Sequence, residues 1–415
     1  MKDPASRSLF QRSESSGDKP RIDQAGNYDP VLGPPRSLNS AYLSSVRDVK
    51  SRIAELCASS DEISALPGEL IDLMTDAKLF AMFMPKSLGG LEVDLITGLQ
   101  AIEEVAAADS TAGWLVVKCA WSNMLAARLP PDVAREIWTT PESCLAGTIA
   151  PKGAARAVKG GYSLSGRWEW GTGSQFATWI MAAAVIVDDA GKPLQTPAGP
   201  ERRIMLVPKA ACSIIDTWHT YGMRGTASND FACADLFVPE RFAIEIDQPG
   251  PKHPVYDQAP YMAQIMLPHA SLAIGAARGC IEALCDLAMG KMPLMSRTLL
   301  KDKEWVQDAV GRATAIVRSA RAYLYESVQA MFEAEAYDAT IGLHLSLAAT
   351  HATHECIRAV DLMTRAAGGT AVYLSSPIQK YFRDLHVAAS HAAVNVERYA
   401  GAGRVVFGDS PSPLM

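Results

Sequence analysis

The sequence predicts an α+β protein of more than one domain, in which a helical region is followed by a β region and then by a second helical region. Its 415 residues are enough for two or three domains at about 150 residues each. Apolar residues recur at helical spacing up to about Leu129 and again from about His269, whereas short β-branched runs split by turn residues lie between them. Hydrophobic residues make up 48% of the chain, which is enough to bury large cores.

The first helical region is predicted to be a domain of residues 39–142, preceded by a disordered tail of residues 1–38. The tail combines Ser, Pro, Gly and mixed charge without periodicity, so we expect it to carry no chemistry. Asp109 and Ser110 are residue types that cap helices, and an apolar stretch follows them. We expect helices over residues 40–57, 66–79, 95–107 and 111–127.

Residues 143–250 are predicted to form an antiparallel β domain. The apolar runs there are short and rich in β-branched residues, as in TWIMAAAVIV (178–187) and RRIMLVP (202–208). Gly160-Gly161 and Asp189-Ala190-Gly191 have the residue types that hairpin turns require.

The second helical region, residues 251–405, is predicted to be a four-helix bundle that ends in a short tail, 406–415. A proline-rich connection precedes it, and long amphipathic stretches follow. Pro377 is a good first residue for the last helix, and Gly401 is a good stop. We expect helices over residues 269–289, 305–336, 341–367 and 377–400.

Composition excludes several classes of function. The formal charge of −6 gives no overall support for nucleic-acid binding. The longest apolar stretch, 177–187, is too short to cross a bilayer, and the first twenty residues lack the apolar core of a secretory signal, so we expect a cytoplasmic protein. The eight cysteines show no metal-binding or disulfide spacing, which predicts free thiols. HATHE (351–355) lacks the partner motif of a metal site, so no metal is expected.

Motifs spread over nearly all of the folded chain carry a family resemblance. They are FMPKSLGGLEVDL (83–95), AIEEVAAADSTAGW (101–114), SGRWEWGTGSQFATW (165–179), YGMRGTASND (221–230) and GGTAVYLSSPIQKYFRDLH (368–386). With these motifs, the chain resembles the acyl-CoA dehydrogenase superfamily. The resemblance implies an N-terminal helical domain, a central antiparallel β-barrel and a C-terminal four-helix bundle. It also implies a flavin bound where the β domain meets the bundle, and a homotetramer.

Trp170 and Thr172 are candidate flavin-binding residues. If they lie on a strand, they point to the same face, so one ring and one hydroxyl share a surface. A flavin needs an apolar face against its rings and a hydrogen-bonding group near N5, and this pair can supply both. The family places its flavin-contacting residues at the matching positions. Without the surrounding motif, a tryptophan on a strand reads as a core residue.

The resemblance implies further cofactor contacts. Thr148 matches a position at the flavin pyrimidine edge, and Trp218 matches another aromatic on the cofactor side. Arg297 resembles an arginine on the phosphate side, and Gly368 and Gly369 resemble a glycine pair beside the flavin phosphate. From the residues alone, the glycine pair reads equally well as a helix C-cap, and Arg297 as a surface arginine.

His391 is the candidate catalytic residue. Acyl-CoA dehydrogenases remove a proton with a glutamate, which in many members lies eight residues after the Asp of an Arg-Asp pair. Counted from Asp384, that position is Ala392, which cannot accept a proton, and His391 precedes it. This resembles the two-component flavin monooxygenases of the same fold, which place a histidine here. An imidazole, with an ordinary pKa of about 6.5, suits proton transfer near neutral pH. A histidine at a helix contact is the structural alternative, and His386 is read as structural.

The substrate pocket departs from the monooxygenase pattern. Many aromatic hydroxylases of this kind carry a second histidine on the helix after the Gly-Trp pair, where this chain has Trp121 and Ser122. We take these two as candidate substrate-binding residues. The substrate is expected to be small and aromatic or heteroaromatic, and N- or S-oxygenation stays open.

The resemblance thus implies the oxygenase component of a flavin-dependent monooxygenase. It would use reduced FMN or FAD, with FMN preferred, and dioxygen, through a C4a-hydroperoxyflavin. No GxGxxG motif follows a strand, so a separate NAD(P)H-dependent flavin reductase is the expected partner. Two alternatives stay open: an acyl-CoA dehydrogenase or oxidase whose base is Glu103 or Glu104, and a catalytically silent flavin-binding protein.

Overall fold

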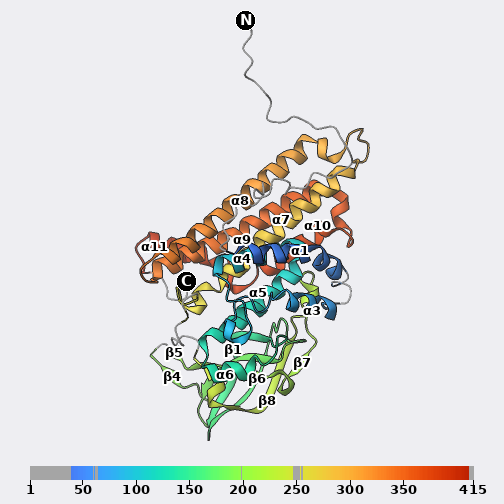
Figure 1. Cartoon of the computed structure of the whole chain (residues 1–415). Helices are drawn as coiled ribbons and strands as arrows, with labels where there is room; N and C mark the ends of the chain where they lie inside the picture. Colours follow the sequence, from blue (N-terminus) through green and yellow to red (C-terminus); the bar gives the residue numbers. More distant parts are fainter. Residues whose placement is uncertain are drawn as a thin grey trace.

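The computed structural model describes residues 39–58, 60, 64–197, 199–245, 253 and 256–410. In this part of the chain the elements form three tiers (Figure 1): a β-sheet at one end, the N-terminal helices in the middle and long C-terminal helices at the other end. The predicted N-terminal tail and residues 411–415 of the predicted C-terminal tail lie outside the described residues. The domain boundaries at 142/143 and 250/251 stay predictions.

The N-terminal helices confirm the prediction to within a few residues and add one short helix, α6. Asp109 caps the helix that follows it, because its carboxylate accepts the backbone N–H groups of Thr111 and Ala112 at 2.8 and 2.9 Å. Nearly every residue of α4 and α5 is buried, so these two helices form the centre of the molecule. The elements are α1 (Ser40–Cys57), α3 (Gly68–Asp76), α4 (Leu95–Ala108), α5 (Ser110–Met124) and α6 (Pro131–Ile137).

The central sheet has seven strands in the order β7-β8-β2-β1-β3-β6-β9. The predicted turn at Gly160-Gly161 joins β1 to β2, and Gly160 has a φ of +83°, a conformation that favours glycine. The strands are β1 (Leu145–Val158), β2 (Gly161–Trp168), β3 (Trp179–Val187), β6 (Arg202–Pro208), β7 (Ser213–Ile215), β8 (Asp230–Pro239) and β9 (Ala243–Ile244). A separate two-stranded ribbon is formed by β4 (Gln195–Thr196) and β5 (Gly199–Pro200).

The prediction of a purely antiparallel β domain is wrong, because β1 and β3 run parallel, with Leu145 beside Trp179. The connection 169–178 causes this. This connection begins at the end of β2, which lies near the start of β1. It leads to the start of β3, which lies on the other side of β1, also near the start of β1. The sheet is therefore mixed. Within the described residues the end strands β7 and β9 each pair with one neighbour, so the predicted closed barrel is not observed.

The C-terminal helices pack against α4 and α5, and one glycine permits a close approach. A Cβ on Gly275 of α7 would lie 2.3 Å from the carbonyl oxygen of Glu103 on α4, so these two backbones meet where only glycine fits. The helices are α7 (Met266–Gly290), α8 (Glu304–Glu333), α9 (Ala339–Ala367), α10 (Pro377–Ala388) and α11 (Glu397–Val406).

The predicted helix over residues 377–400 is wrong beyond Ala388. There α10 ends, and a short 3₁₀ helix, Ala392–Val394, separates it from α11. Side chains in this segment compete for backbone groups: the ring of His391 accepts the N–H of Ala393 at 3.1 Å, and Asn395 accepts the N–H of Glu397 at 3.0 Å. His391 therefore lies outside the helix that carries Asp384.

Two composition-based expectations can be compared with the described residues. All eight cysteines have free thiols, as predicted. Within the same part of the chain, no helix combines the length and the apolar character that a membrane span requires.

Candidate active site

The indole of Trp114, on α5, joins the β region to the C-terminal helices. Its Nε1 donates to the hydroxyl of Thr172 at 3.2 Å. Its ring makes edge-on contacts with His269 of α7 and with His391, at centroid distances of 5.3 and 5.7 Å. Because α5 lies between the sheet and the C-terminal helices (Figure 1), this one side chain touches both sides of the candidate site.

Thr172 belongs to a directional chain of hydroxyl groups. The hydroxyl of Thr226 donates to the backbone carbonyl of Met223 at 2.8 Å, so its oxygen accepts from Ser228, also at 2.8 Å. Ser228 in turn accepts from Thr172 at 2.6 Å, and Thr172 accepts from Trp114. The proton of the Thr172 hydroxyl is therefore committed, while its oxygen keeps a second lone pair. That lone pair suits a ligand N–H, which is what N5 of a reduced flavin carries.

Trp170 lies next to the chain of hydroxyl groups, two residues before Thr172, but it is not on a strand. The strand β2 ends at Trp168, so the predicted shared face of Trp170 and Thr172 is wrong: Thr172 is buried, whereas the side chain of Trp170 is 60% exposed. Trp170 has a φ of +65°, which is strained for a bulky residue, and such strain occurs where the surrounding structure imposes it at functional sites. The exposed indole leaves a flat apolar surface for a ring system. The residues present therefore fit a flavin, and the roles of Trp170 and Thr172 toward it stay predictions.

We expect Trp170→Ala to weaken flavin binding by about tenfold, because a stacked ring contributes on the order of 1 kcal/mol and a tenfold change corresponds to about 1.4 kcal/mol. The melting temperature should hardly change, since the side chain is exposed. Trp305→Ala is the matched control, because Trp305 lies on α8 and its side chain is 54% exposed. Titration of both variants with reduced flavin, with fluorescence as the readout, measures the difference. Equal affinities in both variants would remove Trp170 from the flavin site.

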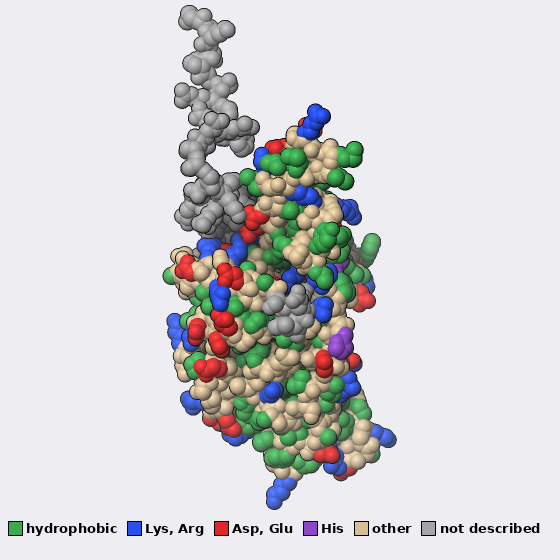
Figure 2. Space-filling model, turned by 90° about the vertical axis from the view of Figure 1, so that its right-hand side faces the viewer, with side chains coloured by type: hydrophobic (Ala, Val, Ile, Leu, Met, Phe, Trp, Pro, Cys, Tyr) green, Lys and Arg blue, Asp and Glu red, His purple; other side chains and the backbone are tan. Residues whose placement is uncertain are grey.

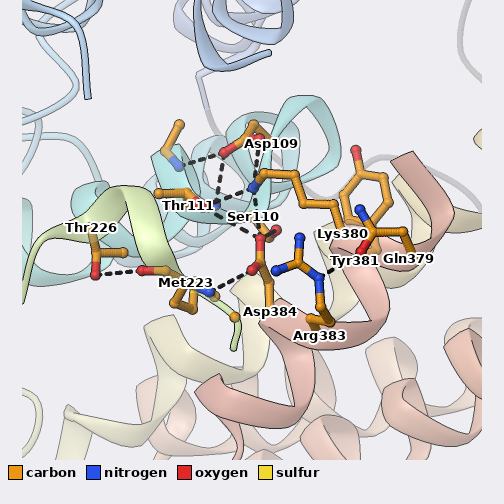
Figure 3. Close-up of polar contacts among 12 residues, drawn as sticks. Asp109, Ser110, Thr111, Met223, Thr226, Gln379, Lys380, Tyr381, Arg383 and Asp384 are labelled. Atoms are coloured by element: carbon orange, nitrogen blue, oxygen red, sulfur yellow. Dashed lines mark hydrogen bonds and ion pairs between the residues drawn. The ribbon is translucent and has the colours of Figure 1, made fainter. Parts of the chain in front are cut away.

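Asp384, on α10, fixes the loop that carries the hydroxyl chain (Figure 3). One carboxylate oxygen accepts the backbone N–H of Met223 at 2.5 Å. The other accepts the hydroxyl of Ser110 at 2.5 Å and pairs with Lys380 at 2.7 Å, and Lys380 also contacts Asp109 at 2.9 Å. Burial acts to raise the pKa of Asp384, but Lys380 and these hydrogen bonds outweigh it and lower the pKa. Asp384 thus locks α10, the N-terminus of α5 and the 221–228 loop together.

His391 lies in a cluster of three nitrogen side chains. Its Nε2 is 3.0 Å from Nζ of Lys118 on α5, and Nζ is 2.8 Å from Nε2 of His269. The two imidazole rings stack at a centroid distance of 4.3 Å. His269 is buried, whereas Lys118 and His391 are each partly buried.

Burial sets the charge of this cluster. It lowers the pKa of both imidazoles well below the usual range, and Lys118 adds to the effect. It lowers the pKa of Lys118 itself to about 7. Both histidines are therefore neutral at neutral pH, and Lys118 loses its proton far more easily than an ordinary lysine.

The structure brings Trp218 to the same region but places Thr148 apart from the hydroxyl chain. Nε1 of Trp218 donates to the carbonyl of Met223 at 2.8 Å, the same carbonyl that ends the hydroxyl chain. Thr148 is partly buried on β1, where the register with β3 shifts, and its hydroxyl accepts the N–H of Ala150 at 3.2 Å. Contacts of Thr148 and Trp218 with a flavin stay predictions.

The candidate substrate residues Trp121 and Ser122 follow Lys118 on α5. Trp121 is buried in an aromatic group, stacked on Tyr261 at 5.4 Å and edge-on to Phe83 at 6.2 Å. Ser122 is buried one turn after Lys118, and residues four apart share a helix face. Ser122 is therefore placed toward the cluster, whereas Trp121 supports the core beside it.

Arg297, Gly368 and Gly369 lie at the far ends of α7 and α9 and are exposed, away from Trp114. Gly368 has a φ of +58°, and its N–H bonds to the carbonyl of Arg365, so it caps α9. Among the described residues, a Cβ on either glycine would meet nothing within 4 Å, so no close approach to them requires the pair. A cavity of about 250 Å³, partly lined by Thr370, lies next to this turn. The phosphate role of all three residues stays a prediction.

Glu103 and Glu104 are held by partners in the helical core. Glu103 accepts from Tyr325 at 2.7 Å and from Arg321 at 2.9 Å. Glu104 pairs with Arg278 and with Arg47. Burial opposes ionisation of Glu104, but its arginines lower its pKa to about 2. Burial raises the pKa of Glu103, but its carboxylate is occupied by Arg321 and Tyr325. Both carboxylates therefore serve as structural ion pairs, which leaves them poorly suited to the alternative role of dehydrogenase base.

Sequence reasoning missed Trp114, Lys118, His269 and Ser228. One signal was available for Lys118, since it is the only charged residue in the stretch 110–124 and lies one turn after Trp114. Nothing in the sequence links His269, more than a hundred residues later, to this turn.

Two family models match the chain: "Acyl-CoA dehydrogenase, N-terminal domain" over residues 40–128 and "Acyl-CoA dehydrogenase, C-terminal domain" over residues 267–396. Together they span more than half of the 415 residues.

Similar proteins agree with these models. The chain is 29% identical over 384 residues to the indole-3-acetate monooxygenase of Pseudomonas putida, which covers 90% of this chain and 94% of that protein. It is 27% identical to the FADH(2)-dependent resorcinol hydroxylase, oxygenase component, of a Rhizobium strain, with coverage of 83% and 89%. The solved structure of XiaF from Streptomyces in complex with FADH2 and glycerol superimposes with a TM-score of 0.82 at 26% identity, covering 90% of this chain and 96% of that one. The chain therefore belongs to the acyl-CoA dehydrogenase superfamily, and within it to the flavin-dependent monooxygenases that act as oxygenase components of two-component systems.

Proposed function

We propose that this monooxygenase hydroxylates a small aromatic or heteroaromatic substrate at the cluster formed by Lys118, His269 and His391. The observation that carries the proposal is the position of Trp114: its Nε1 binds Thr172, where the flavin is expected, and its ring contacts both imidazoles. A substrate held at the cluster then lies beside the flavin rather than elsewhere in the fold. The names of the similar proteins, which oxidise aromatic compounds, support the same class of substrate.

A reduced flavin bound here would activate dioxygen, so that one oxygen atom of O₂ is transferred to the substrate. The chain's own residues bind and orient. Thr172 offers a lone pair, Trp170 offers an apolar face, and the buried ring of Trp114 connects Thr172 to the two imidazoles. Because α4, α5 and the first part of α7, up to Ile281, are buried almost throughout, little bulk water reaches this part of the molecule.

His391 is proposed to orient groups rather than to accept a proton. Its Nδ1 accepts the N–H of Ala393, its Nε2 faces Lys118, and its pKa lies well below 6.5 because it is buried, with Lys118 and Arg398 nearby. An imidazole with both nitrogens engaged and a low pKa is a weak base but a well-fixed donor.

The remaining partners are also proposals. We infer a separate NAD(P)H-dependent flavin reductase, as the two-component relatives imply, a cytoplasmic location and a homotetramer. On the face shown in Figure 2, hydrophobic side chains lie among polar and charged ones. Exposed apolar surface favours contact with other chains, and strongly exposed apolar residues lie in the segments that follow α7 and α9: Met292, Leu294, Met295, Val372, Tyr373 and Leu374. The preference for FMN over FAD stays a prediction.

The proposal is tested by mixing the protein and chemically reduced FMN or FAD with oxygenated buffer and a panel of phenols, indoles and sulfur heterocycles. We expect a hydroxylated product that depends on the protein, on reduced flavin and on oxygen, with no pyridine nucleotide present. Reduction of bound oxidised flavin by an acyl-CoA, with no oxygenated product from the panel, would instead establish a dehydrogenase. Flavin binding with neither reaction would establish a silent flavoprotein.

A further inference from the structure

The positions of the protons on His269 and His391 are fixed by the backbone. In each ring, Nδ1 contacts a backbone group and Nε2 faces Nζ of Lys118. Nδ1 of His269 lies 2.8 Å from the carbonyl oxygen of Ile265, so Nδ1 carries the proton and Nε2 is a free acceptor. Nδ1 of His391 accepts the N–H of Ala393, so in the neutral ring the proton is on Nε2. One imidazole therefore presents an acceptor to Lys118, and the other presents a donor.

Only an uncharged lysine satisfies both rings. An ammonium group has three donors and no acceptor, so it would confront the Nε2–H of His391 with another donor. An amine donates one N–H to His269 and accepts the N–H of His391 with its lone pair, at the observed 2.8 and 3.0 Å. One N–H of the amine is then left over.

The surroundings allow this state. Among the residues that the structure describes, no carboxylate forms an ion pair with Lys118. The titratable and charged groups that face the cluster are Cys119, next to Lys118 on α5, and Arg398 of α11, which lowers the pKa of both imidazoles. The ring of Trp114, 4.4 Å from Nζ, attracts a cation, so the charged form stays accessible when the pH falls.

We propose that Lys118 contacts the substrate as an uncharged amine: the two imidazoles occupy its lone pair and one N–H, and the remaining N–H binds a neutral oxygen or nitrogen acceptor on the aromatic substrate. This rests on the proposed function. Protonation of Lys118 forces His391 to give up its bond to Ala393 and to reorient, so the site works above the pKa of Lys118 and fails below it.

The chain offers a set of variants that separates the amine from the ammonium. Glutamine at position 118 reproduces the amine, because its oxygen can accept from His391 while its NH₂ donates once to His269 and once to the substrate. Arginine reproduces the ammonium, since it is always charged and has no acceptor. Methionine fills the space with neither a charge nor an N–H group. Lys159→Gln, in the exposed turn between β1 and β2, is the control for loss of a lysine.

We expect product formation by the wild-type protein and by Lys159→Gln to fall below an apparent pKa near 7, the pKa of the buried lysine. Lys118→Gln should lose this acidic limb and keep a plateau within about tenfold of wild type, whereas Lys118→Arg and Lys118→Met should lose about a hundredfold at every pH, the usual scale for one positioned polar group. An acidic limb that persists in Lys118→Gln, activity in Lys118→Arg, or wild-type activity that falls above pH 7 instead would each overturn the proposal.

A second measurement needs no turnover, so it tests the charge of Lys118 even if the proposed substrate class is wrong. The folded pKa of about 7 lies below the ordinary value of about 10.4, so between these values the unfolded chain binds a proton that the folded protein does not. Stability that depends on Lys118 therefore rises with pH in this range. The melting temperature of wild type minus that of Lys118→Gln should increase from pH 6 to pH 9. A difference that stays flat would show that Lys118 keeps its proton, which contradicts the proposal.

Discussion

His391→Ala is expected to leave flavin binding nearly intact and to lower the amount of hydroxylated product per reduced flavin by tenfold or more. The ring packs on His269 at 4.3 Å and directs its Nε2 at Lys118, so its removal frees the lysine lone pair and opens space beside Trp114. Lys118 then binds a proton more readily, and the N–H that it offers to the substrate is no longer held in one direction. The hydroxyl chain that contains Thr172 does not involve His391, so the flavin should still bind.

His386→Ala is the matched control for this prediction. His386 lies on α10, is partly exposed, and contacts the carbonyl of Phe382 at 2.7 Å and Asp361 at 3.6 Å. Its substitution should change coupling by less than about twofold, because these contacts are not with Lys118, His269 or His391. The loss of stability should be a few tenths of a kcal/mol at most. Coupling that is equal in both variants would remove His391 from the active site. The measurement is product formed against hydrogen peroxide released in a single turnover.

Asp384→Ala is expected to lower the free energy of unfolding by about 3–5 kcal/mol, the usual cost of removing one partner of a buried ion pair. It removes one of the two carboxylates that Lys380 contacts and frees the N–H of Met223, so the 221–228 loop loses its anchor. Since that loop carries Thr226 and Ser228, flavin binding should weaken together with stability. Denaturant unfolding and flavin titration measure the two effects.

The pH dependence of stability gives a second readout for Asp384. Its folded pKa is lowered, so its contribution is present above the ordinary value of about 3.9 and is lost as the pH falls through the folded value. Asp384→Asn should therefore unfold with a weaker dependence on pH below about 4. Asp308→Ala, which removes a carboxylate paired with Arg312 on the surface of α8, should change little. Equal losses in the Asp384 and Asp308 variants would show that the anchor is unimportant.

Element types were predictable from the sequence because periodicity and caps are local signals. Asp109 caps α5 as expected, and Gly160 lies in the turn that connects β1 to β2. The parallel pairing of β1 and β3 was not predictable, since it depends on which side of β1 the connection 169–178 crosses to, and no local signal records that. The break after Ala388 was missed for a different reason: His391 and Asn395 bind backbone N–H groups in the segment that follows, and an isolated histidine is not a recognised helix breaker.

The site could be predicted only in part. The motif comparison pointed to Thr172 and His391, and the structure connects both to one indole. It could not supply Lys118 and His269, because they meet His391 only through packing of α5 on α7. It also misjudged Trp170, whose left-handed backbone conformation depends on the turn that follows β2.

Isotope labelling tests the account most directly. A single turnover of the protein with chemically reduced flavin, an aromatic substrate and ¹⁸O₂ should give a product that carries one ¹⁸O atom, and Lys118→Arg should give little of it. Product whose new oxygen comes from water, or no oxygenated product while an acyl-CoA reduces the bound flavin, would contradict the assignment of the Trp114 cluster as an oxygenase site.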